Sequence, residues 1–127
     1  MKTNTVIVVD DEPDLAEIIK YICEPFDINV HAVEGGKNFS DLLKTVVPDF
    51  VFIDIFMPEM DGFEIVKWLE LNASTYPIVL VSGDKDYLKI AESLATGGGL
   101  NVVSTLAKPI DLTSLEELIK NLANPEE

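Results

Sequence analysis

The amino-acid sequence predicts an α/β domain built on a doubly wound, five-stranded parallel sheet with helices on both faces. Short segments rich in β-branched residues alternate along the chain with longer segments of helical periodicity, which is typical of a parallel sheet with crossover helices. One segment, residues 51–57, is apolar throughout except for Asp54, as expected of a strand that is covered on both faces. The 127 residues suffice for one domain with a hydrophobic core.

Proline, glycine and apolar periodicity mark where each element begins and ends. Pro13 suits the first turn of a helix, where no amide donor is needed, and Pro25 stops that helix. Gly35-Gly36 turns the chain into a second helix, which Pro48 closes. The predicted elements are, in chain order, strand 5–9, helix 13–24, strand 28–33, helix 36–46, strand 51–54, helix 62–73, strand 78–81, helix 86–96, strand 101–106 and a last helix that starts at 112 and frays at 124–125.

Apolar residues recur at intervals of three and four in the predicted helices, so they share a face that we expect to pack on the sheet. These inward residues are Leu15, Ile18, Ile19 and Ile22, then Phe39, Leu42, Leu43 and Val46, then Phe63, Val66 and Leu69, and finally Leu115, Leu118, Ile119 and Leu122. The strict alternation of strands and helices predicts the strand order 2-1-3-4-5 and a flavodoxin-like three-layer sandwich.

Charge and composition exclude several classes of protein. The net charge of −14 argues against direct nucleic-acid binding, which uses clustered Lys and Arg, and suits a domain that handles a cation. The chain shows no export leader and no apolar run of about 18 residues, so we expect no membrane span and a cytoplasmic location. The single cysteine, Cys23, cannot form an internal disulfide and is expected to be a small core residue.

Polar residues stand at the carboxyl ends of four predicted strands. Asp10 and Asp11 follow the first strand, Asp54 ends the third, Ser82 ends the fourth and Lys108 follows the fifth. With the strand order 2-1-3-4-5 these ends are neighbours at the switch point where doubly wound sheets bind ligands. Each residue alone has an ordinary structural alternative, as an acidic helix cap or a turn residue. Their joint placement is what indicates a functional site.

The residue types at these strand ends suit phosphoryl transfer. Three neighbouring carboxylates repel one another unless a cation lies between them, and oxygen ligands favour Mg²⁺ over Zn²⁺. Lys108 and the Ser82 hydroxyl, on the opposite rim, would complete a binding site for a phosphoryl group. Asp54 is the central acid and therefore the expected nucleophile, which would form an aspartyl phosphate.

Four motifs, in order and over almost the whole chain, resemble the receiver domain of two-component response regulators. They are Val6-Ile7-Val8-Val9-Asp10-Asp11-Glu12-Pro13, Asp54-Ile55-Phe56-Met57-Pro58-Glu59-Met60-Asp61-Gly62, Val81-Ser82-Gly83 and Lys108-Pro109. The resemblance implies that Asp54 accepts a phosphoryl group from a phosphohistidine of a sensor histidine kinase or histidine phosphotransfer protein. It implies Mg²⁺ held by Asp11, Asp54 and the backbone carbonyl of Phe56, with Asp10 acting through water.

The resemblance also implies a signalling domain that assists its own phosphorylation and dephosphorylation, rather than a separate enzyme. Ser82 corresponds to the switch hydroxyl of the family. A phosphoryl group adds about −1.5 to −2 charges, and drawing Ser82 toward it shifts the loop after the fourth strand. The face of the fourth helix, fifth strand and fifth helix is therefore the expected partner surface. Tyr87, Leu100 and Val103 are its candidate apolar contacts, although we expect each of them to be partly buried in the core. Its partners would be an output domain or protein, or a second copy in a phosphorylation-dependent homodimer.

Two features depart from the usual receiver pattern. Thr105 stands three positions before Lys108, where receivers usually carry an aromatic residue that follows the switch hydroxyl. The connection from Ser82 to Lys108 is a few residues long for the family and contains Gly97-Gly98-Gly99-Leu100, which is either a tolerated insertion or a link to a subfamily. That subfamily comprises receivers ahead of cyclic-di-GMP phosphodiesterase (EAL-type) domains.

Two further side chains flank the mouth of the expected site. Phe56 lies two residues beyond Asp54 and is predicted to shield the phosphoryl group, and Asp84 lies two residues beyond Ser82 and would help or repel the attacking water. We expect a receiver domain over residues 1–124 and a tail over 125–127.

The main alternative is an interaction module with the receiver fold that signals without phosphate. Thr105 favours it, and the presence of Asp11, Asp54, Ser82 and Lys108 argues against it. An FMN carrier would need a phosphate-binding Ser/Thr/Gly loop after the first strand, but here that loop is acidic. A haloacid-dehalogenase-type phosphatase would carry its nucleophile in an Asp-x-Asp motif after its first strand, which Asp10-Asp11-Glu12 does not match. The sequence does not identify the cognate kinase, the output, the phosphoryl lifetime, the oligomeric state or whether the chain is a fragment.

Overall fold

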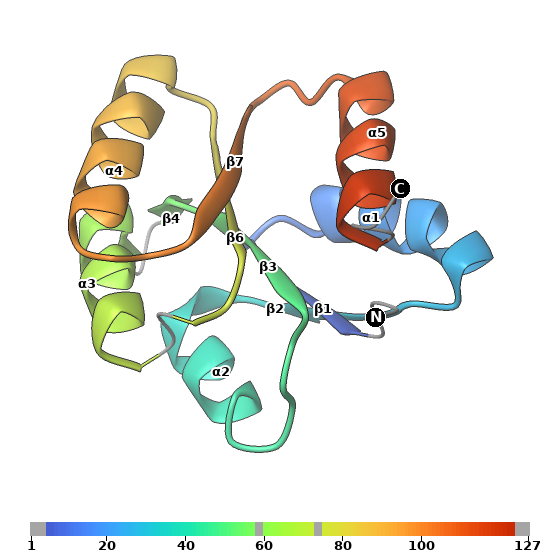
Figure 1. Cartoon of the computed structure of the whole chain (residues 1–127), viewed down its shortest axis with the longest axis horizontal. Helices are drawn as coiled ribbons and strands as arrows, with labels where there is room; N and C mark the ends of the chain where they lie inside the picture. The colour runs from blue at the N-terminus through green and yellow to red at the C-terminus, as the bar shows by residue number, and fades with distance from the viewer. Residues whose placement is uncertain (1–4, 58–59, 73–74, 124–127) are drawn as a thin grey trace.

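A computed structural model describes residues 5–57, 60–72 and 75–123. Over these residues the chain alternates strands and helices almost as the sequence predicts (Figure 1). The elements are β1 (Thr5–Val9), α1 (Pro13–Cys23), the 3₁₀ helix η1 (Glu24–Phe26), β2 (Asn29–Val33), α2 (Gly35–Leu42), β3 (Phe50–Asp54), β4 (Phe56–Met57), β5 (Met60–Asp61), α3 (Gly62–Asn72), β6 (Ile78–Ser82), α4 (Lys85–Gly97), β7 (Val102–Ala107) and α5 (Leu112–Ala123).

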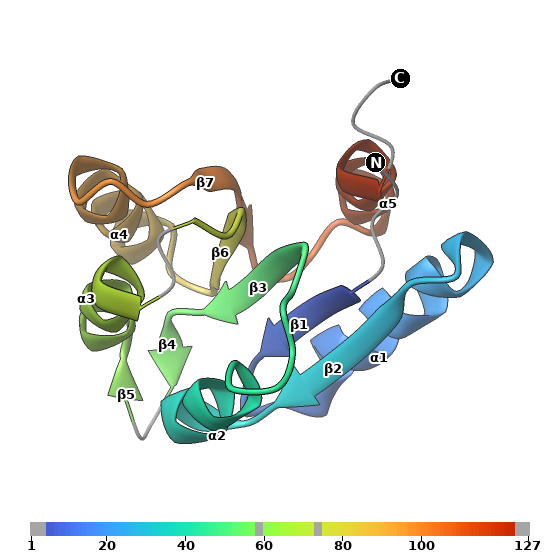
Figure 2. The ribbon, with the colours of Figure 1, turned by 60° about the horizontal axis from the view of Figure 1, so that its bottom comes forward.

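The main sheet has the order β2-β1-β3-β6-β7, and every neighbouring pair is parallel. This is the predicted 2-1-3-4-5 order, and it confirms the doubly wound fold. The short strands β4 and β5 form a separate antiparallel hairpin, in the segment between the predicted strand 51–54 and the predicted helix 62–73. Figure 2 shows this hairpin beyond the end of β3, leading into α3.

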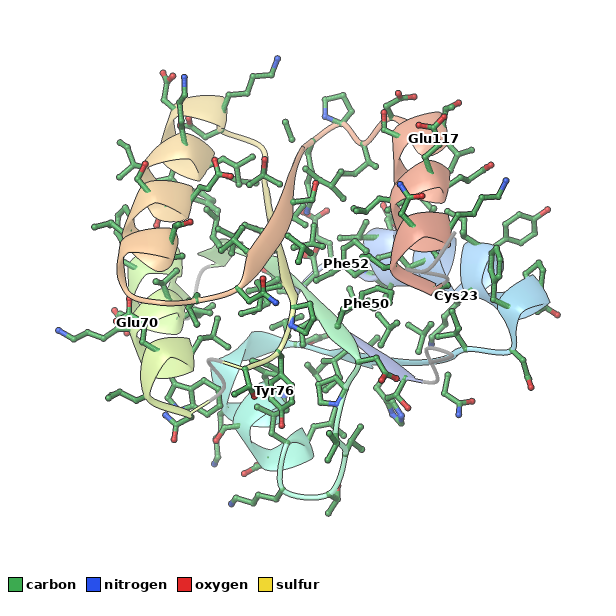
Figure 3. All side chains as sticks on the ribbon, viewed as in Figure 1. Cys23, Phe50, Phe52, Glu70, Tyr76 and Glu117 are labelled. Atoms are coloured by element: carbon green, nitrogen blue, oxygen red, sulfur yellow. The ribbon has the colours of Figure 1, made fainter. Side chains whose placement is uncertain are left out.

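Helices cover the sheet on both faces, with α1 and α5 on one side and α2, α3 and α4 on the other (Figure 1). Alternate residues of each central strand point to opposite faces, so Ile7 packs toward α2–α4 while Val8 packs toward α1 and α5. In Figure 3 the labelled rings of Phe50 and Phe52 lie on the α1–α5 side, near Cys23. All five residues of β3 are buried, as its apolar sequence predicts.

Most of the predicted inward residues are buried or packed against the core, but two positions differ from expectation. Ile18 is 38% exposed and Phe63 is 37% exposed, because each lies at the edge of its helix's apolar stripe. Leu100, a candidate surface contact that was expected to be partly buried, is only 5% exposed and belongs to the core. Helix α2 ends at Leu42 rather than at 46, because β-branched residues precede Pro48 and disfavour a further helical turn. The predicted helix end at 73 and the fraying at 124–125 lie outside the described residues.

The glycine run after α4 turns the chain sharply toward β7. Gly98 caps α4, and an added Cβ there would overlap the Glu70 side chain of α3, which is labelled in Figure 3. Gly99 has φ +89, a conformation that favours glycine. The Gly-rich segment is therefore a tight helix-to-strand turn that brings α4 against α3.

Two expectations from composition concern Cys23 and membranes. Cys23 is a free, fully buried thiol whose pKa burial raises to about 11, which confirms it as a core residue. Among the described residues, the helices are too short or too polar to cross a bilayer. The cytoplasmic location stays a prediction.

Candidate functional site

Three of the predicted site residues meet at the carboxyl edge of the sheet. Asp10 and Asp11 directly follow β1, and Asp54 is the last residue of β3, which pairs with β1. One carboxylate oxygen from each lies within 4.8 Å of the others. Asp10 and Asp54 are each 5% exposed, whereas Asp11 is exposed to solvent. The expected proximity of the three acids is therefore observed.

Lys108 reaches into this cluster from the end of β7. Its Nζ lies 3.0 Å from Asp10 Oδ2 and 2.9 Å from Asp54 Oδ2. The Lys108 amide donates to the Ser82 carbonyl at 2.8 Å, which anchors the residue beside the end of β6. The Lys108 ammonium was expected on the opposite rim of the site, but its flexible side chain contacts the two buried carboxylates directly.

Backbone amides hold the second oxygen of each buried carboxylate. Asp10 Oδ1 accepts a hydrogen bond from the Glu12 amide at 3.0 Å, and Asp54 Oδ1 accepts one from the Phe56 amide at 2.8 Å. Glu12 is the N-cap of α1 and its side chain makes no capping hydrogen bond, so the alternative of an acidic side-chain cap does not apply to it. Both carboxylates are thus oriented by the chain that immediately follows them.

Ser82 is fully buried at the end of β6, one residue beyond Val81, the strand partner of Asp54. Its hydroxyl accepts a hydrogen bond from the Asp84 amide at 3.1 Å. The Asp84 carboxylate in turn caps α4 by accepting from the amides of Asp86 and Tyr87, each at 3.0 Å. The turn role considered for Ser82 is therefore present, and it connects the hydroxyl to the start of α4.

The pKa values of Asp54 and Lys108 are both raised, for different reasons. Burial raises the pKa of Asp54, and the hydrogen bonds from Lys108 and from the Phe56 amide oppose this only in part. Burial would lower the pKa of Lys108, but its hydrogen bonds and charge interactions with Asp54 and Asp10 raise it overall. The site therefore holds a basic carboxylate beside an ammonium that stays protonated.

The donor set fits a hard divalent cation. Carboxylate oxygens from three acids converge, and the Lys108 ammonium shows that positive charge is accommodated between two of them. The resemblance to receiver domains also implies the backbone carbonyl of Phe56 as a Mg²⁺ ligand, and this role stays a prediction. Within the described chain, this is the one cluster of three such residues.

Sequence reasoning missed an aromatic cluster beside the site. The ring of Tyr87, in the first turn of α4, lies 5.8 Å from the Phe56 ring and 4.8 Å from the Phe63 ring, centroid to centroid. These residues come from three separate elements, so periodicity within any one of them gives no signal for their contact.

Comparisons with known proteins agree with this geometry. The family model described as the response regulator receiver domain matches residues 6–120. The regulatory protein AtoC of Escherichia coli is 26% identical over 117 residues, and an uncharacterized 14.6 kDa protein of Leptolyngbya boryana is 30% identical over 118 residues. The aligned segments cover 92% and 91% of this chain, and 24% and 86% of those proteins.

A solved response regulator from Colwellia psychrerythraea superimposes with a TM-score of 0.80 at 33% identity, covering 98% of this chain and 99% of that one. This chain spans only 24 to 43% of the length of AtoC and two other curated regulators. Fold, strand-end cluster and family model agree: the chain belongs to the family of response regulator receiver domains, which are signalling domains of two-component systems.

Proposed function

We propose that this receiver domain accepts a phosphoryl group on Asp54, in a Mg²⁺-dependent reaction, and thereby switches a protein-interaction face. The observation that carries the proposal is the position of the Lys108 ammonium, bound to both Asp10 and Asp54 at the carboxyl edge of the sheet. A cation poised beside a buried, basic carboxylate is what stabilises charge on a transferred phosphoryl group.

The donor would be a phosphohistidine of a sensor kinase or phosphotransfer protein. A carboxylate oxygen of Asp54 attacks phosphorus, and the P–N bond breaks. The donor imidazole, which carries a proton on its other ring nitrogen, keeps the bonding electron pair and leaves as neutral imidazole. The Phe56 amide keeps the Asp54 carboxylate oriented, and Lys108 transfers its hydrogen bonding from Asp54 to the new phosphoryl oxygens. The product is an acyl phosphate on Asp54.

Asp10, Asp11, Asp54 and the Phe56 carbonyl would hold the Mg²⁺, with Asp10 acting through water. When bound, the metal would neutralise the carboxylates and withdraw charge from the phosphoryl oxygens. The Ser82 hydroxyl would donate to the phosphoryl group, and its link to the Asp84 amide would carry that change to α4.

Membership of the receiver family indicates two classes of partner, kinases and output domains. A kinase or phosphotransfer protein would supply the phosphoryl group, and an output domain or protein, or a second copy of the chain, would bind the α4–β7–α5 face. Val103 is 41% exposed and could contact a partner on this face. Leu100 is buried and therefore could not. The link to receivers ahead of EAL-type domains and the domain boundary at residue 124 stay predictions.

A phosphate-independent interaction module is the second candidate function. The observation that favours it is Thr105, a half-buried residue of β7 where an aromatic side chain would couple the switch to the surface. In that case Lys108, Asp10 and Asp54 would form a structural ion-pair network only.

The test is intact-mass analysis after incubation with acetyl phosphate, with Mg²⁺ or with EDTA, on wild type and on Asp54→Ala. We expect a single phosphoryl adduct that needs Mg²⁺ and disappears in Asp54→Ala. An adduct that persists in Asp54→Ala would contradict the assignment of the acceptor. If no adduct forms and a beryllofluoride titration shows no Mg²⁺-dependent binding, the phosphate-independent module is the correct description.

Phe56→Asn is expected to speed dephosphorylation about fivefold, which corresponds to about 1 kcal/mol in the barrier. The Phe56 side chain is 69% exposed, so its replacement would remove the proposed shield of the site without opening the core. The measurement is the decay of the phosphoryl adduct after the donor is removed. Leu71→Asn, at an 81% exposed position of α3, is the control, and an unchanged rate in Phe56→Asn would show that the ring does not shield the site.

A further inference from the structure

The aromatic cluster of Phe56, Phe63 and Tyr87 lies where two loops of the proposed phosphorylation site meet. Phe56 is in β4, two residues after Asp54, and Tyr87 is in the first turn of α4, five residues after Ser82. The Phe56 and Tyr87 rings meet edge to face, with an interplanar angle of 89°, and the tilted Phe63 ring supports Tyr87 from α3. Edge-to-face contact is a favourable arrangement for aromatic rings.

Tyr87 packs against the hydrophobic core, whereas the other two rings of the cluster are largely outside it. Phe56 is 69% exposed and Phe63 is 37% exposed, whereas the core rings of Phe39, Phe50 and Phe52 are 1% exposed or less. An exposed ring such as Phe56 gains little free energy from burial. Its edge-to-face contact with Tyr87, which is itself packed against the core, is therefore a candidate for the interaction that fixes its position.

Backbone amides of Phe56 and Tyr87 connect these two residues to the site by hydrogen bonds. The Phe56 amide donates to Asp54 Oδ1 at 2.8 Å. On the other side, the Tyr87 amide donates to Asp84 Oδ1 at 3.0 Å, and the Asp84 amide donates to the Ser82 hydroxyl at 3.1 Å. Together with the contact between the Phe56 and Tyr87 rings, these hydrogen bonds form a continuous series of contacts from Asp54 to Ser82.

We propose that Tyr87 is a positioning residue that holds Phe56 over the mouth of the site and couples the loop after β6 to the loop after β3. This inference rests on the proposed function and deepens it. When the Ser82 hydroxyl turns toward the phosphoryl group, the Asp84 amide and the first turn of α4 follow, and the Tyr87 ring carries Phe56 with it. The lifetime of the acyl phosphate and the position of α4 are then controlled by one contact, although β7 has Thr105 instead of an aromatic residue.

A double-mutant cycle of Phe56→Ala and Tyr87→Ala tests the coupling through the dephosphorylation rate. Each single variant is expected to speed dephosphorylation about fivefold, within the roughly twofold to tenfold range that an aromatic pair supports. The double variant should be no faster than either single variant. Multiplied effects, or a wild-type rate in Tyr87→Ala, would overturn the proposal.

Three controls separate positioning from general loosening of the fold. Tyr87→Phe keeps the ring and should restore the wild-type rate, which assigns the effect to the ring and not to the hydroxyl. The Mg²⁺ affinity of Tyr87→Ala, measured by calorimetry, should equal that of wild type. Tyr21→Ala, at a 78% exposed position of α1, should change neither quantity. Failure of Tyr87→Phe to restore the rate would overturn the role of the ring.

A readout without phosphate distinguishes failure of this inference from failure of the proposed function. Phe56→Ala should speed amide hydrogen exchange at Asp86 and Tyr87, the two amides that Asp84 caps, by about fivefold because the first turn of α4 loses its ring contact. Exchange in α1 should stay unchanged. If wild type forms no phosphoryl adduct but amide exchange speeds up in Phe56→Ala, the coupling between the rings is supported and the proposed phosphoryl transfer is wrong. If the adduct forms but amide exchange is unchanged in Phe56→Ala, only the coupling is wrong.

Discussion

Lys108→Met is expected to lower the free energy of unfolding of the metal-free protein by about 3 kcal/mol at neutral pH, because it leaves buried charges without a partner. The side chains of Asp10 and Asp54 are 1% and 6% exposed, and Lys108 Nζ lies within 3.0 Å of both. Methionine preserves the length and much of the volume of the side chain but not its charge. The measurement is urea denaturation in EDTA.

Lys44→Met provides the matched control, since Lys44 pairs with Asp41 at 3.4 Å on the surface, with both side chains more than half exposed. Such pairs contribute at most about 1 kcal/mol. The pKa of Lys108 is raised in the fold, so its contribution is complete below the ordinary value of 10.5 and is lost as pH rises through the folded pKa. Mg²⁺ should restore part of the stability of Lys108→Met. Equal losses in the two variants would mean that the buried ion pairs do not form in solution.

The fold was predictable from sequence because its signals are local and consistent. The central strands β1, β3 and β6 are mainly apolar and most helices have a periodic apolar face, so the alternation of the two patterns indicates a parallel, doubly wound sheet. The hairpin of β4 and β5 escaped prediction because strands of two residues show no pattern. Phe63 was assigned inward by its spacing, yet its ring lies at the helix edge against Tyr87, a contact between elements that spacing within α3 does not show.

The candidate site was predictable to the level of residue type and strand end. Parallel strands bring their carboxyl ends to one edge, so Asp10, Asp54, Ser82 and Lys108 were expected to be neighbours. The hydrogen bonds were not predictable: Lys108 spans two carboxylates, and Ser82 engages the cap of α4 through Asp84. These details depend on side-chain reach and loop conformation, which a sequence pattern does not specify.

Asp54→Asn is expected to raise the free energy of unfolding of the metal-free protein at neutral pH, while it abolishes the phosphoryl adduct. Removal of the Lys108 ammonium would leave the carboxylates of Asp10 and Asp54 without a partner. Removal of the Asp54 carboxylate leaves Lys108 paired with Asp10, so no buried charge loses its partner. Burial is the largest cause of the raised pKa of Asp54, which means that the carboxylate is less stable in the fold than in the unfolded chain. The measurement is urea denaturation of both proteins in EDTA across a pH series.

The sign of the pH dependence distinguishes this explanation from a general effect of charge. Between the ordinary value of 3.8 and the raised pKa, the folded wild type holds a proton that the unfolded chain has lost, so wild-type stability falls as pH rises. The advantage of Asp54→Asn should therefore be complete above the folded pKa and vanish below 3.8. Asp11→Asn removes an equal charge from the same cluster at an exposed position and should gain less, because burial rather than repulsion is the main cost. An equal gain in both variants would show that repulsion among the three acids dominates, and Mg²⁺ should then reverse the order by stabilising wild type most.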